Sequence, residues 1–349
     1  MTTARTTMYA NQLDSPAPLG DRPLHWRETE RPVPAAGQLL IKVIACGVCR
    51  SNLHMIEGDW VDGGVPAISP IVPGHEVTGT VVELAEDVTG FELGQTVGVQ
   101  PLWWTCEECE FCTSGREMLC HQRKITGEHV DGGYGEYMLA TAAHTYALPD
   151  GLDPVDAAPL FCPGITAFGV VDKLDLGPGD VVAVFGLGGV GHMAVQFAAL
   201  TGAEVVGVGR NRDHLAVAVE LGASRTVDST DADADALAEI AGTADAVLNF
   251  APVDTVTEQA LATLKWGGTL VSAVPVTVTD FPFNTEQTIR GSVLGNREQM
   301  QEVLRLAAEG KVRTVTERFP LDRATEALDR LAAGTLRSRA VLAAAETLD

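Results

Sequence analysis

Four cysteines in one short stretch of the chain have the residue type and spacing to surround a single small metal ion. They form a C-x2-C-x2-C-x7-C pattern made of Cys106, Cys109, Cys112 and Cys120. Zinc prefers four tetrahedral nitrogen or sulfur ligands, and a site filled by four thiolates has no open position for a reacting group. We therefore predict a structural zinc site in a lobe of about residues 101–122, which contributes to folding and not to chemistry.

Three further cysteines, Cys46, Cys49 and Cys162, remain outside this pattern. Two of them could join a histidine around a second metal ion and leave one coordination position free, as catalytic zinc sites do. Disulfides are the alternative, but the odd number of cysteines and the C-x2-C-x2-C spacing argue against them. The first twenty residues also lack the continuous apolar run of a signal peptide, which predicts a cytoplasmic protein with reduced thiols.

Composition narrows the classes of partner. The 349 residues carry a formal net charge of -23, and only five of the 24 basic residues are lysines. A surface this acidic repels a phosphate backbone, so nucleic acid is not an expected partner, and no membrane association is expected. Excess acid with little lysine is typical of proteins adapted to molar salt, where the Debye length falls to about 3 Å, and we therefore predict a halophilic protein.

Two different sequence patterns along the chain predict two domains. From Leu39 to about Leu148, short β-rich runs alternate with Gly, Pro and Asp turns, which is typical of an all-β module. After residues 149–151, apolar strand patterns alternate with helical ones, which predicts parallel βαβ units. The last fifty or so residues return to mixed helix and strand, so the α/β domain is expected to be inserted into the first one.

A glycine-rich turn in the α/β region predicts a dinucleotide site. The motif GLGGVG at 186–191 follows the apolar strand pattern VVAVF and precedes a helical pattern. In this setting bare backbone N–H groups approach a pyrophosphate at the positive end of the helix. The cofactor-binding residues expected here are Gly186, Gly188, Gly189, Val190 and Gly191.

The residues that follow the second strand of this unit predict the choice of cofactor. An Asp or Glu usually binds the ribose 2'-hydroxyl of NAD at this place, but the chain has Gly209, followed by Arg210, Asn211 and Arg212. No carboxylate is present there to repel a 2'-phosphate, and guanidinium groups bind phosphate bidentately. We therefore predict a preference for NADP(H), with Gly209, Arg210 and Arg212 in the binding site.

Taken together, the motifs resemble those of the zinc-dependent medium-chain dehydrogenases, alcohol dehydrogenase type, over nearly the whole chain. The segments that carry the resemblance, in the order typical of that family, are GVCRSNLH, PGHEVTGTV, the four-cysteine lobe, DGGYGEY, CPGIT and GLGGVG. The resemblance implies an α/β plus all-β fold. It consists of a GroES-like catalytic domain at 1–158, a Rossmann NADP-binding domain at 159–295 and a return to the catalytic domain at 296–349.

The resemblance also implies the catalytic residues. Cys49, His75 and Cys162 would hold a catalytic zinc ion, with Glu76 as an occasional alternative ligand, while Cys46 would be a buried apolar residue. Such a zinc ion is a Lewis acid that polarises an alcohol or carbonyl oxygen. Ser51 and His54 match the hydroxyl and imidazole of the family's proton relay.

Three more residues are assigned to the cofactor by resemblance alone. Arg50 and Arg339 would contact the pyrophosphate, and Thr166 would face the nicotinamide. Asn52 departs from the family pattern, in which Asp is usual, although an Asn can still accept a hydrogen bond from His75. Pro101 is a second departure, because a large aromatic residue often narrows the pocket there.

These observations predict a zinc-dependent alcohol dehydrogenase that holds two zinc ions per chain and uses NADP(H), acting on small alcohols, aldehydes or ketones. A polyol or sugar dehydrogenase of the same fold is the nearest alternative. In a different class, the four-cysteine lobe could mark a zinc-ribbon binding module without catalysis. The resemblance further implies a homo-oligomer, either a dimer or a tetramer.

Overall fold

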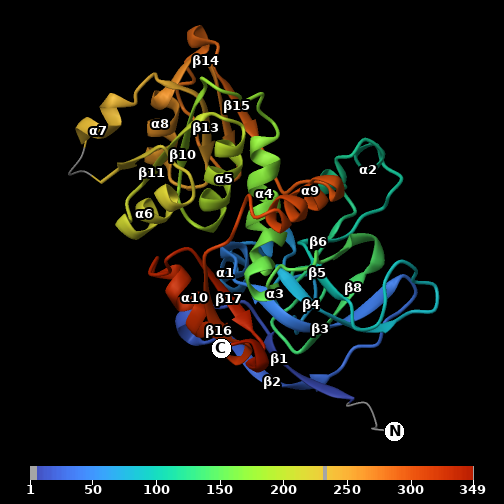
Figure 1. Cartoon of the computed structure of the whole chain (residues 1–349). Coiled ribbons are helices and arrows are strands. Elements are labelled where there is room, and N and C mark those ends of the chain that lie inside the picture. Colours follow the sequence, from blue (N-terminus) through green and yellow to red (C-terminus); the bar gives the residue numbers. More distant parts are fainter. Residues whose placement is uncertain (1–5, 231–233, 349) are drawn as a thin grey trace. The chain divides into compact units, whose positions relative to one another are not determined.

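The structure is a computed structural model that describes residues 6–230 and 234–348. The chain forms two compact units, one made of Met1–Cys162 with Thr314–Asp349 and the other of Pro163–Arg313 (Figure 1). The predicted boundary at 158/159 lies shortly before the division of the two units after Cys162. The predicted boundary at 295/296 lies before helix α9 (Arg297–Ala308), whereas the structure keeps α9 in the second unit. The predicted boundaries of the functional domains, at 158/159 and 295/296, stay a proposal.

The first unit is built around a seven-stranded sheet of the order β16-β17-β3-β4-β5-β9, with β8 also paired to β3. Smaller two-stranded sheets are formed by β1 with β2 and by β6 with β7. The strands are β1 (Thr7–Leu13), β2 (Leu24–Glu30), β3 (Gln38–Gly47), β4 (Val77–Leu84), β5 (Thr96–Val99), β6 (Leu102–Trp104), β7 (Lys124–Ile125), β8 (Tyr137–Thr141), β9 (Thr145–Ala147), β16 (Thr316–Pro320) and β17 (Arg339–Ala343). The helices are α1 (Arg50–Glu57), α2 (Glu110–Thr113), α3 (Pro154–Ala157) and α10 (Ala324–Ala332).

Apolar side chains of β3 and its neighbours form the core of this unit. Leu39, Ile41 and Val43 of β3 are each at most 1% exposed and pack with Val77 and Val81 of β4. The C-terminal strands β16 and β17 join the same sheet, because β17 pairs antiparallel with the end of β3. Figure 1 labels β16 and β17, in red, in the same unit as the blue β3, and β17 lies between β16 and β3 in the sheet. The predicted return of the chain to its first sheet therefore has a physical basis in strand pairing.

Strand pairing brings three strand ends to one edge of the sheet. In the antiparallel register, Cys46 near the end of β3 lies opposite Val77 at the start of β4. Gly47 lies opposite Val341 of β17. The residues just after β3, just before β4 and at the start of β17 consequently lie close together, although they are far apart in sequence.

The second unit contains six strands, all parallel, in the order β12-β11-β10-β13-β14-β15. They are β10 (Val181–Phe185), β11 (Glu204–Gly209), β12 (Arg225–Asp228), β13 (Ala244–Asn249), β14 (Leu264–Ser272) and β15 (Thr288–Gly291). The helices are α4 (Pro163–Val171), α5 (Gly189–Leu200), α6 (Arg212–Glu220), α7 (Ala234–Glu239), α8 (Asp254–Thr263) and α9. The predicted alternation of strands and helices is confirmed.

The strand order reverses at β10, whose neighbours are β11 on one side and β13 on the other. In open parallel sheets, ligands bind beyond the carboxyl ends of the strands at such a reversal. The GLGGVG turn follows β10 directly and leads into α5. The fold therefore places the predicted pyrophosphate-binding glycines where dinucleotides bind in sheets of this kind.

Two glycines of this turn are required by the backbone. Gly186 has a φ of 88°, a left-handed conformation that favours glycine. A Cβ at Gly191 would lie 2.1 Å from the carbonyl oxygen of Gly186, so α5 can begin this close to the turn only with a glycine there. A Cβ at Gly188 would meet no atom within 4 Å, which leaves open space beside the start of α5.

No single helix in residues 6–230 and 234–348 is long and apolar enough to cross a membrane. Two short consecutive helical segments reach that length and apolar composition only when they are taken together. The uncharged stretch 181–203 is divided into β10, the glycine turn and the buried helix α5.

Candidate active site

Two cysteines, one histidine and one glutamate form a compact group in the first unit. The ligand atoms of Cys49, His75, Glu76 and Cys162 all lie within 4.8 Å of one another. Cys49 is the N-cap residue of α1, and His75 and Glu76 immediately precede β4. Cys162 follows a short 3-10 helix, Ala158–Phe161, whose residues are buried. The structure therefore brings together all four residues that the resemblance assigned to the catalytic metal.

The separation of the two thiols fits a tetrahedral zinc ion. The Sγ atoms of Cys49 and Cys162 are 3.9 Å apart. Two sulfurs bound to one tetrahedral zinc at about 2.3 Å each would lie about 3.8 Å apart. Two thiols and an imidazole are also the donor types that zinc prefers, whereas Mg²⁺ and Ca²⁺ prefer oxygen. The residues present therefore fit a zinc ion with an open coordination position.

The environment of Cys49 favours its thiolate. The pKa of Cys49 is held well below its ordinary value, mainly by the hydrogen bond with the Cys162 thiol, with further contributions from Arg339 and His75. These effects outweigh burial, which acts in the opposite direction. Because the thiolate is the form of cysteine that binds metal, this group is prepared for coordination. Cys46, in contrast, is fully buried in the core cluster, and burial raises its pKa.

Glu76 is engaged by a buried arginine. The Arg339 guanidinium contacts both carboxylate oxygens, through Nη2 to Oε1 and through Nε to Oε2, the latter at 3.2 Å. The side chains are 7% and 0% exposed, so the pair is almost completely shielded from water. Glu76 could act as an alternative zinc ligand only if one of its carboxylate oxygens left Arg339 and bound the metal instead. The predicted role of Arg339 at the pyrophosphate stays a prediction, and the structure adds a carboxylate partner that the sequence did not indicate.

The orientation of Asn52 differs from the expected one. Its side-chain nitrogen, and not its oxygen, faces Nδ1 of His75, at 3.4 Å. Its Oδ1 accepts hydrogen bonds from the Tyr134 hydroxyl at 3.2 Å and from the backbone N–H of Cys49 at 3.3 Å. Because two donors already bind the oxygen, the amide is held with its nitrogen toward the imidazole.

This orientation affects how His75 can bind a metal. Nε2 of His75 lies 3.5 Å from Ser51 Oγ, which itself donates to Cys49 Sγ at 3.0 Å, so Nε2 is on the side of the cysteine ligands. An imidazole that coordinates through Nε2 carries its proton on Nδ1 and donates it to an acceptor. Asn52 presents a donor at that place. Turning the amide would present its oxygen to Nδ1 of His75 and set its nitrogen against the Cys49 N–H.

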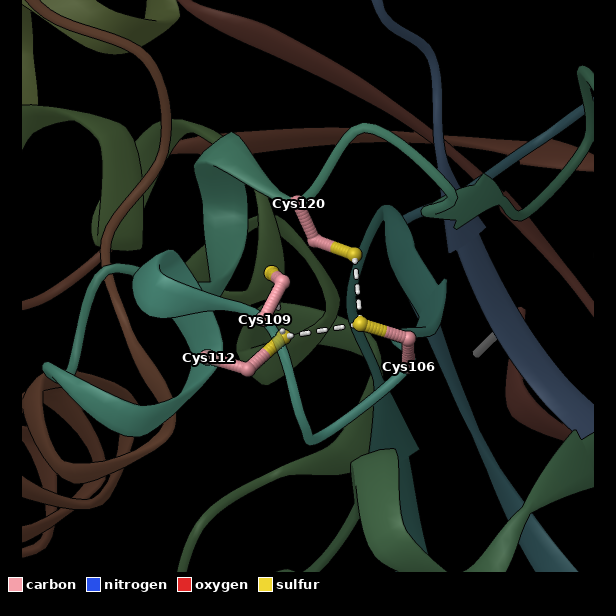
Figure 2. A group of neighbouring side chains, drawn as sticks. All are labelled: Cys106, Cys109, Cys112 and Cys120. Carbon is pink, nitrogen blue, oxygen red and sulfur yellow. Dashed lines mark hydrogen bonds between the residues drawn. The ribbon is translucent and has the colours of Figure 1, made fainter.

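The four cysteines of the predicted structural site also converge, and Figure 2 shows their side chains pointing toward one another. Sulfur pairs lie 3.8 Å apart for Cys106 and Cys112, and 3.5 Å apart both for Cys109 and Cys112 and for Cys120 and Cys106. These separations fit four sulfurs around one tetrahedral zinc. None of the seven cysteines, all of which lie in the described residues, forms a disulfide, which agrees with metal binding.

Backbone N–H groups prepare one of these thiols for metal binding. The N–H groups of Glu108 and Cys109 lower the pKa of Cys106 to about 7, whereas burial and neighbouring thiols raise that of Cys112 to about 12. Cys120 donates to the sulfur of Cys106, which agrees with this lowering. A metal ion that binds this group must displace the protons held by the other thiols.

Ser51 and His54 of the predicted relay lie three residues apart on α1, and so on adjacent turns of the same face. The His54 side chain is 35% exposed, and its Nδ1 lies 2.6 Å from Asp59 Oδ2. Arg50, at the start of α1, is exposed, and its Nη2 lies 3.5 Å from the carbonyl oxygen of Leu331.

The residues predicted to choose the cofactor lie at the carboxyl edge of the parallel sheet. Gly209 ends β11, and Arg210 and Arg212 follow it as exposed residues. Asn211 caps α6 by accepting hydrogen bonds from the next backbone N–H groups. Thr166 is half-buried on α4.

Asp228, the last residue of β12, is a candidate cofactor-site residue that was not predicted from the sequence. It lies opposite Gly209 in the parallel register, and its Oδ2 is 4.0 Å from Arg212 Nε. A carboxylate is therefore present at this edge of the sheet. It lies at the end of β12 and not at the end of the neighbouring β11, where an Asp or Glu is usual. The strand pattern RTVD could have indicated it, because carboxyl ends of adjacent parallel strands meet at one edge.

Comparisons with known proteins identify the two units. Residues 35–150 match the family model of the alcohol dehydrogenase GroES-like domain, and residues 189–309 match that of zinc-binding dehydrogenases. The chain is 37% identical over 326 residues to an alcohol dehydrogenase of Geobacillus stearothermophilus, covering 91% of this chain and 95% of the relative. The predicted GroES-like and Rossmann domains are confirmed.

Solved structures agree with these matches. Acetophenone reductase from Geotrichum candidum, in complex with NAD, has a TM-score of 0.88 at 27% identity and 99% coverage of both chains. A putative zinc-binding dehydrogenase from Sinorhizobium meliloti, bound to NADP, has a TM-score of 0.87 at 28% identity, with 97% of this chain and 100% of that chain covered.

The orientation of Asn52 leads to a test. We expect Asn52→Asp to slow the loss of zinc to a chelator about 10-fold, because a carboxylate can accept the Nδ1 proton of His75 while still accepting from Tyr134 and Cys49. The release would be followed with a chromogenic chelator, alongside the loss of activity. Asn296→Asp, at the N-cap of α9, is the matched control. Equal or faster loss of zinc from Asn52→Asp would contradict the argument.

Proposed function

Because the chain belongs to the zinc-dependent medium-chain alcohol dehydrogenase family, we propose that it interconverts small alcohols with aldehydes or ketones using NADP(H) as the hydride carrier. The observation that carries the proposal is the group of two thiols and one imidazole formed by Cys49, His75 and Cys162. A zinc-ribbon binding module would not require this second group or the GLGGVG turn.

When bound, zinc supplies a Lewis acid that polarises the substrate oxygen, and the nicotinamide accepts or delivers the hydride. The chain's own residues must move the accompanying proton. The Ser51 hydroxyl contacts Cys49 Sγ and lies beside His75 Nε2, so it is placed to exchange a proton with an oxygen held by the same ligands. His54 lies one turn later on α1 and is partly exposed, so we propose that it passes the proton to solvent.

We propose two zinc ions per chain, one at each cysteine group. The support is the close approach of the ligand atoms in both groups, 4.8 Å or less, and the absence of disulfides among the seven cysteines, all of which the structure describes. The absence of disulfides among the described cysteines is also consistent with the proposed cytoplasmic location, because reducing compartments disfavour disulfides.

Metal analysis of cysteine variants tests both sites. We expect two zinc ions in the wild type. Cys49→Ser should retain one ion and lose turnover, because the open site loses a ligand. Cys109→Ser should also retain one ion but keep measurable turnover, with a lower midpoint of thermal unfolding. Cys46→Ala, which alters a thiol outside both groups, should keep two ions. One ion in the wild type, with no NADPH-dependent turnover, would favour a binding protein.

The proposed preference for NADP(H) rests on the arginines after β11. Arg210 is exposed and has no carboxylate within 4.0 Å among the described residues, so its charge is available to a 2'-phosphate. Arg212 is 92% exposed at its side chain and lies at the limit of an ion pair with Asp228, which leaves most of its donors unused. The half-buried Asp228 acts against the preference, and the two guanidinium groups must outweigh it.

Substitution of these arginines tests the cofactor choice. We expect Arg210→Ala to raise the dissociation constant for NADPH about 10-fold or more, because a hydrogen bond to a charged group contributes about 1.5–3 kcal/mol. The constant for NADH should change little. Arg225→Ala removes an exposed arginine of the same unit that pairs with Glu204, and it serves as the control. A higher catalytic efficiency of the wild type with NADH than with NADPH would refute the preference.

We also propose adaptation to high salt, supported by the net charge of -23 and the five lysines. Repulsion among exposed carboxylates is screened in molar salt and grows on dilution, as the Debye length rises to about 10 Å at 0.1 M. We expect activity to fall on transfer to low salt. Full activity below about 0.1 M salt would show that the acidic surface has another cause.

The proposed homo-oligomer and the functional domain boundaries at 158/159 and 295/296 rest on family membership.

A further inference from the structure

Two residues that follow helix α1 hold the side chain of His54. The carboxylate Oδ2 of Asp59 lies 2.6 Å from the imidazole Nδ1. The ring of Trp60 lies 5.8 Å from the imidazole, centroid to centroid, at an interplanar angle of 34°. The imidazole therefore has a carboxylate at Nδ1 and a tilted aromatic ring beside it.

The backbone at the end of α1 makes this arrangement possible. Gly58 adopts a left-handed conformation with a φ of 89° and donates to the carbonyl oxygens of His54 and Met55. The chain then turns back, and the backbone N–H of Asp59 donates to the His54 carbonyl oxygen at 3.0 Å. Asp59 thus binds His54 through both its backbone and its side chain, and Trp60 packs against the core cluster of the unit.

The contact determines which imidazole nitrogen is free. A carboxylate accepts hydrogen bonds, so a neutral His54 must carry its proton on Nδ1 in order to donate to Asp59. Nε2 is then the nitrogen with a lone pair, and no hydrogen bond or ion pair to it is found among the described residues. In catalytic groups of serine, histidine and aspartate, a carboxylate on one ring nitrogen holds the tautomer and orientation that let the other nitrogen accept a proton.

We propose that Asp59 is a positioning residue that holds His54 with Nε2 available to accept and release a proton. The inference rests on the proposed function, in which His54 carries the alcohol proton to solvent. Asp59 is not part of the metal-binding group and would act only through His54.

The contact is suited to positioning more than to stabilising the fold. The side chains of His54 and Asp59 are 35% and 54% exposed, and ion pairs with this exposure contribute little to stability. Removing the carboxylate should therefore leave the fold and both metal groups intact. Any change in turnover then reports on the orientation of the imidazole.

The experiment compares Asp59→Asn, Asp59→Glu and His54→Gln in the full chain loaded with zinc. Asp62→Asn is the matched control, because Asp62 is a nearby exposed aspartate that forms no hydrogen bond or ion pair with the described residues. The readouts are kcat and KM for alcohol oxidation and the solvent deuterium isotope effect on kcat. The ¹⁵N shifts of the His54 ring, which report its tautomer without turnover, are measured on the same proteins.

For Asp59→Asn we expect kcat to fall about 10-fold, with KM, zinc content and thermal midpoint unchanged, because only the proton transfer is impaired. The solvent isotope effect should rise, and the share of the His54 ring that carries its proton on Nδ1 should fall, because an amide can present its NH2 group to Nδ1 as well as its oxygen. Asp59→Glu should restore most of the loss, and Asp62→Asn should match the wild type. The double variant Asp59→Asn/His54→Gln should be no slower than His54→Gln alone.

The outcomes that overturn the inference are distinct from those that overturn the relay. If His54→Gln is slow but Asp59→Asn keeps the wild-type kcat and isotope effect, Asp59 has no positioning role and the relay stands. If His54→Gln itself keeps the wild-type kcat, the relay fails and the inference fails with it. A wild-type His54 ring that carries its proton on Nε2 would overturn the inference directly.

Discussion

The catalytic group depends on the meeting of two sulfurs and one nitrogen that come from three distant segments of the chain. Cys49, His75 and Cys162 are brought within 4.8 Å of one another without any local spacing that would require it. Each ligand is tied to a rigid part of the first unit: the start of α1, the start of β4 and the end of a buried 3-10 helix. Because metal ligands need positions correct to a few tenths of an ångström, the rest of the unit serves to hold these three places.

The central sheet provides that accuracy. β3 pairs with both β4 and β17, so the last residues of β3 lie beside the first residues of the other two strands. Gly47 donates to the carbonyl oxygen of Glu76, and Val48 donates to that of Ala340, each at 2.9 Å. A shift of one residue in either register would move every side chain to the other face of the sheet. The strand pairing therefore determines the spacing of the ligands more strongly than any single loop.

The same strand ends bury a charged pair beside the metal group. Glu76 precedes β4 and Arg339 begins β17, and each is almost completely shielded from water. Removing one partner of a buried pair typically costs about 3–5 kcal/mol, because the remaining charge is left without compensation. The pair links the C-terminal strand to the ligand segment and sets a positive charge near Cys49, which lowers the pKa of that thiol.

The two metal groups differ in how they are built. Cys106, Cys109, Cys112 and Cys120 lie within fifteen residues, so their convergence requires little beyond a local turn around α2. Glu107 has a φ of 60° there, a left-handed conformation within the turn. The catalytic group instead uses ligands from residues 49 to 162, so it forms only when the whole sheet has folded. A local site can bind its metal early, whereas the catalytic site depends on long-range pairing.

Much of the fold could be predicted from the sequence, because the signals involved are local. The four-cysteine spacing, the GLGGVG turn after an apolar strand and the alternation of strands and helices each act over a few tens of residues. The choice of Cys49, His75 and Cys162 came instead from the order of motifs shared with a family, since spacing alone left open which thiols and which histidine would meet.

Tertiary structure decided the contacts between side chains that are far apart in the sequence or that compete for one hydrogen-bond partner. Asn52 was expected to offer an oxygen to His75, but Tyr134 and the Cys49 backbone bind that oxygen first. Arg339 was expected at the cofactor, and β17 brings it to Glu76. The sequence by itself determined which residue types were present and which local turns they could form. Only the packed sheet decided which donor met which acceptor, because hydrogen-bond partners are selected by distance in space and not by distance along the chain.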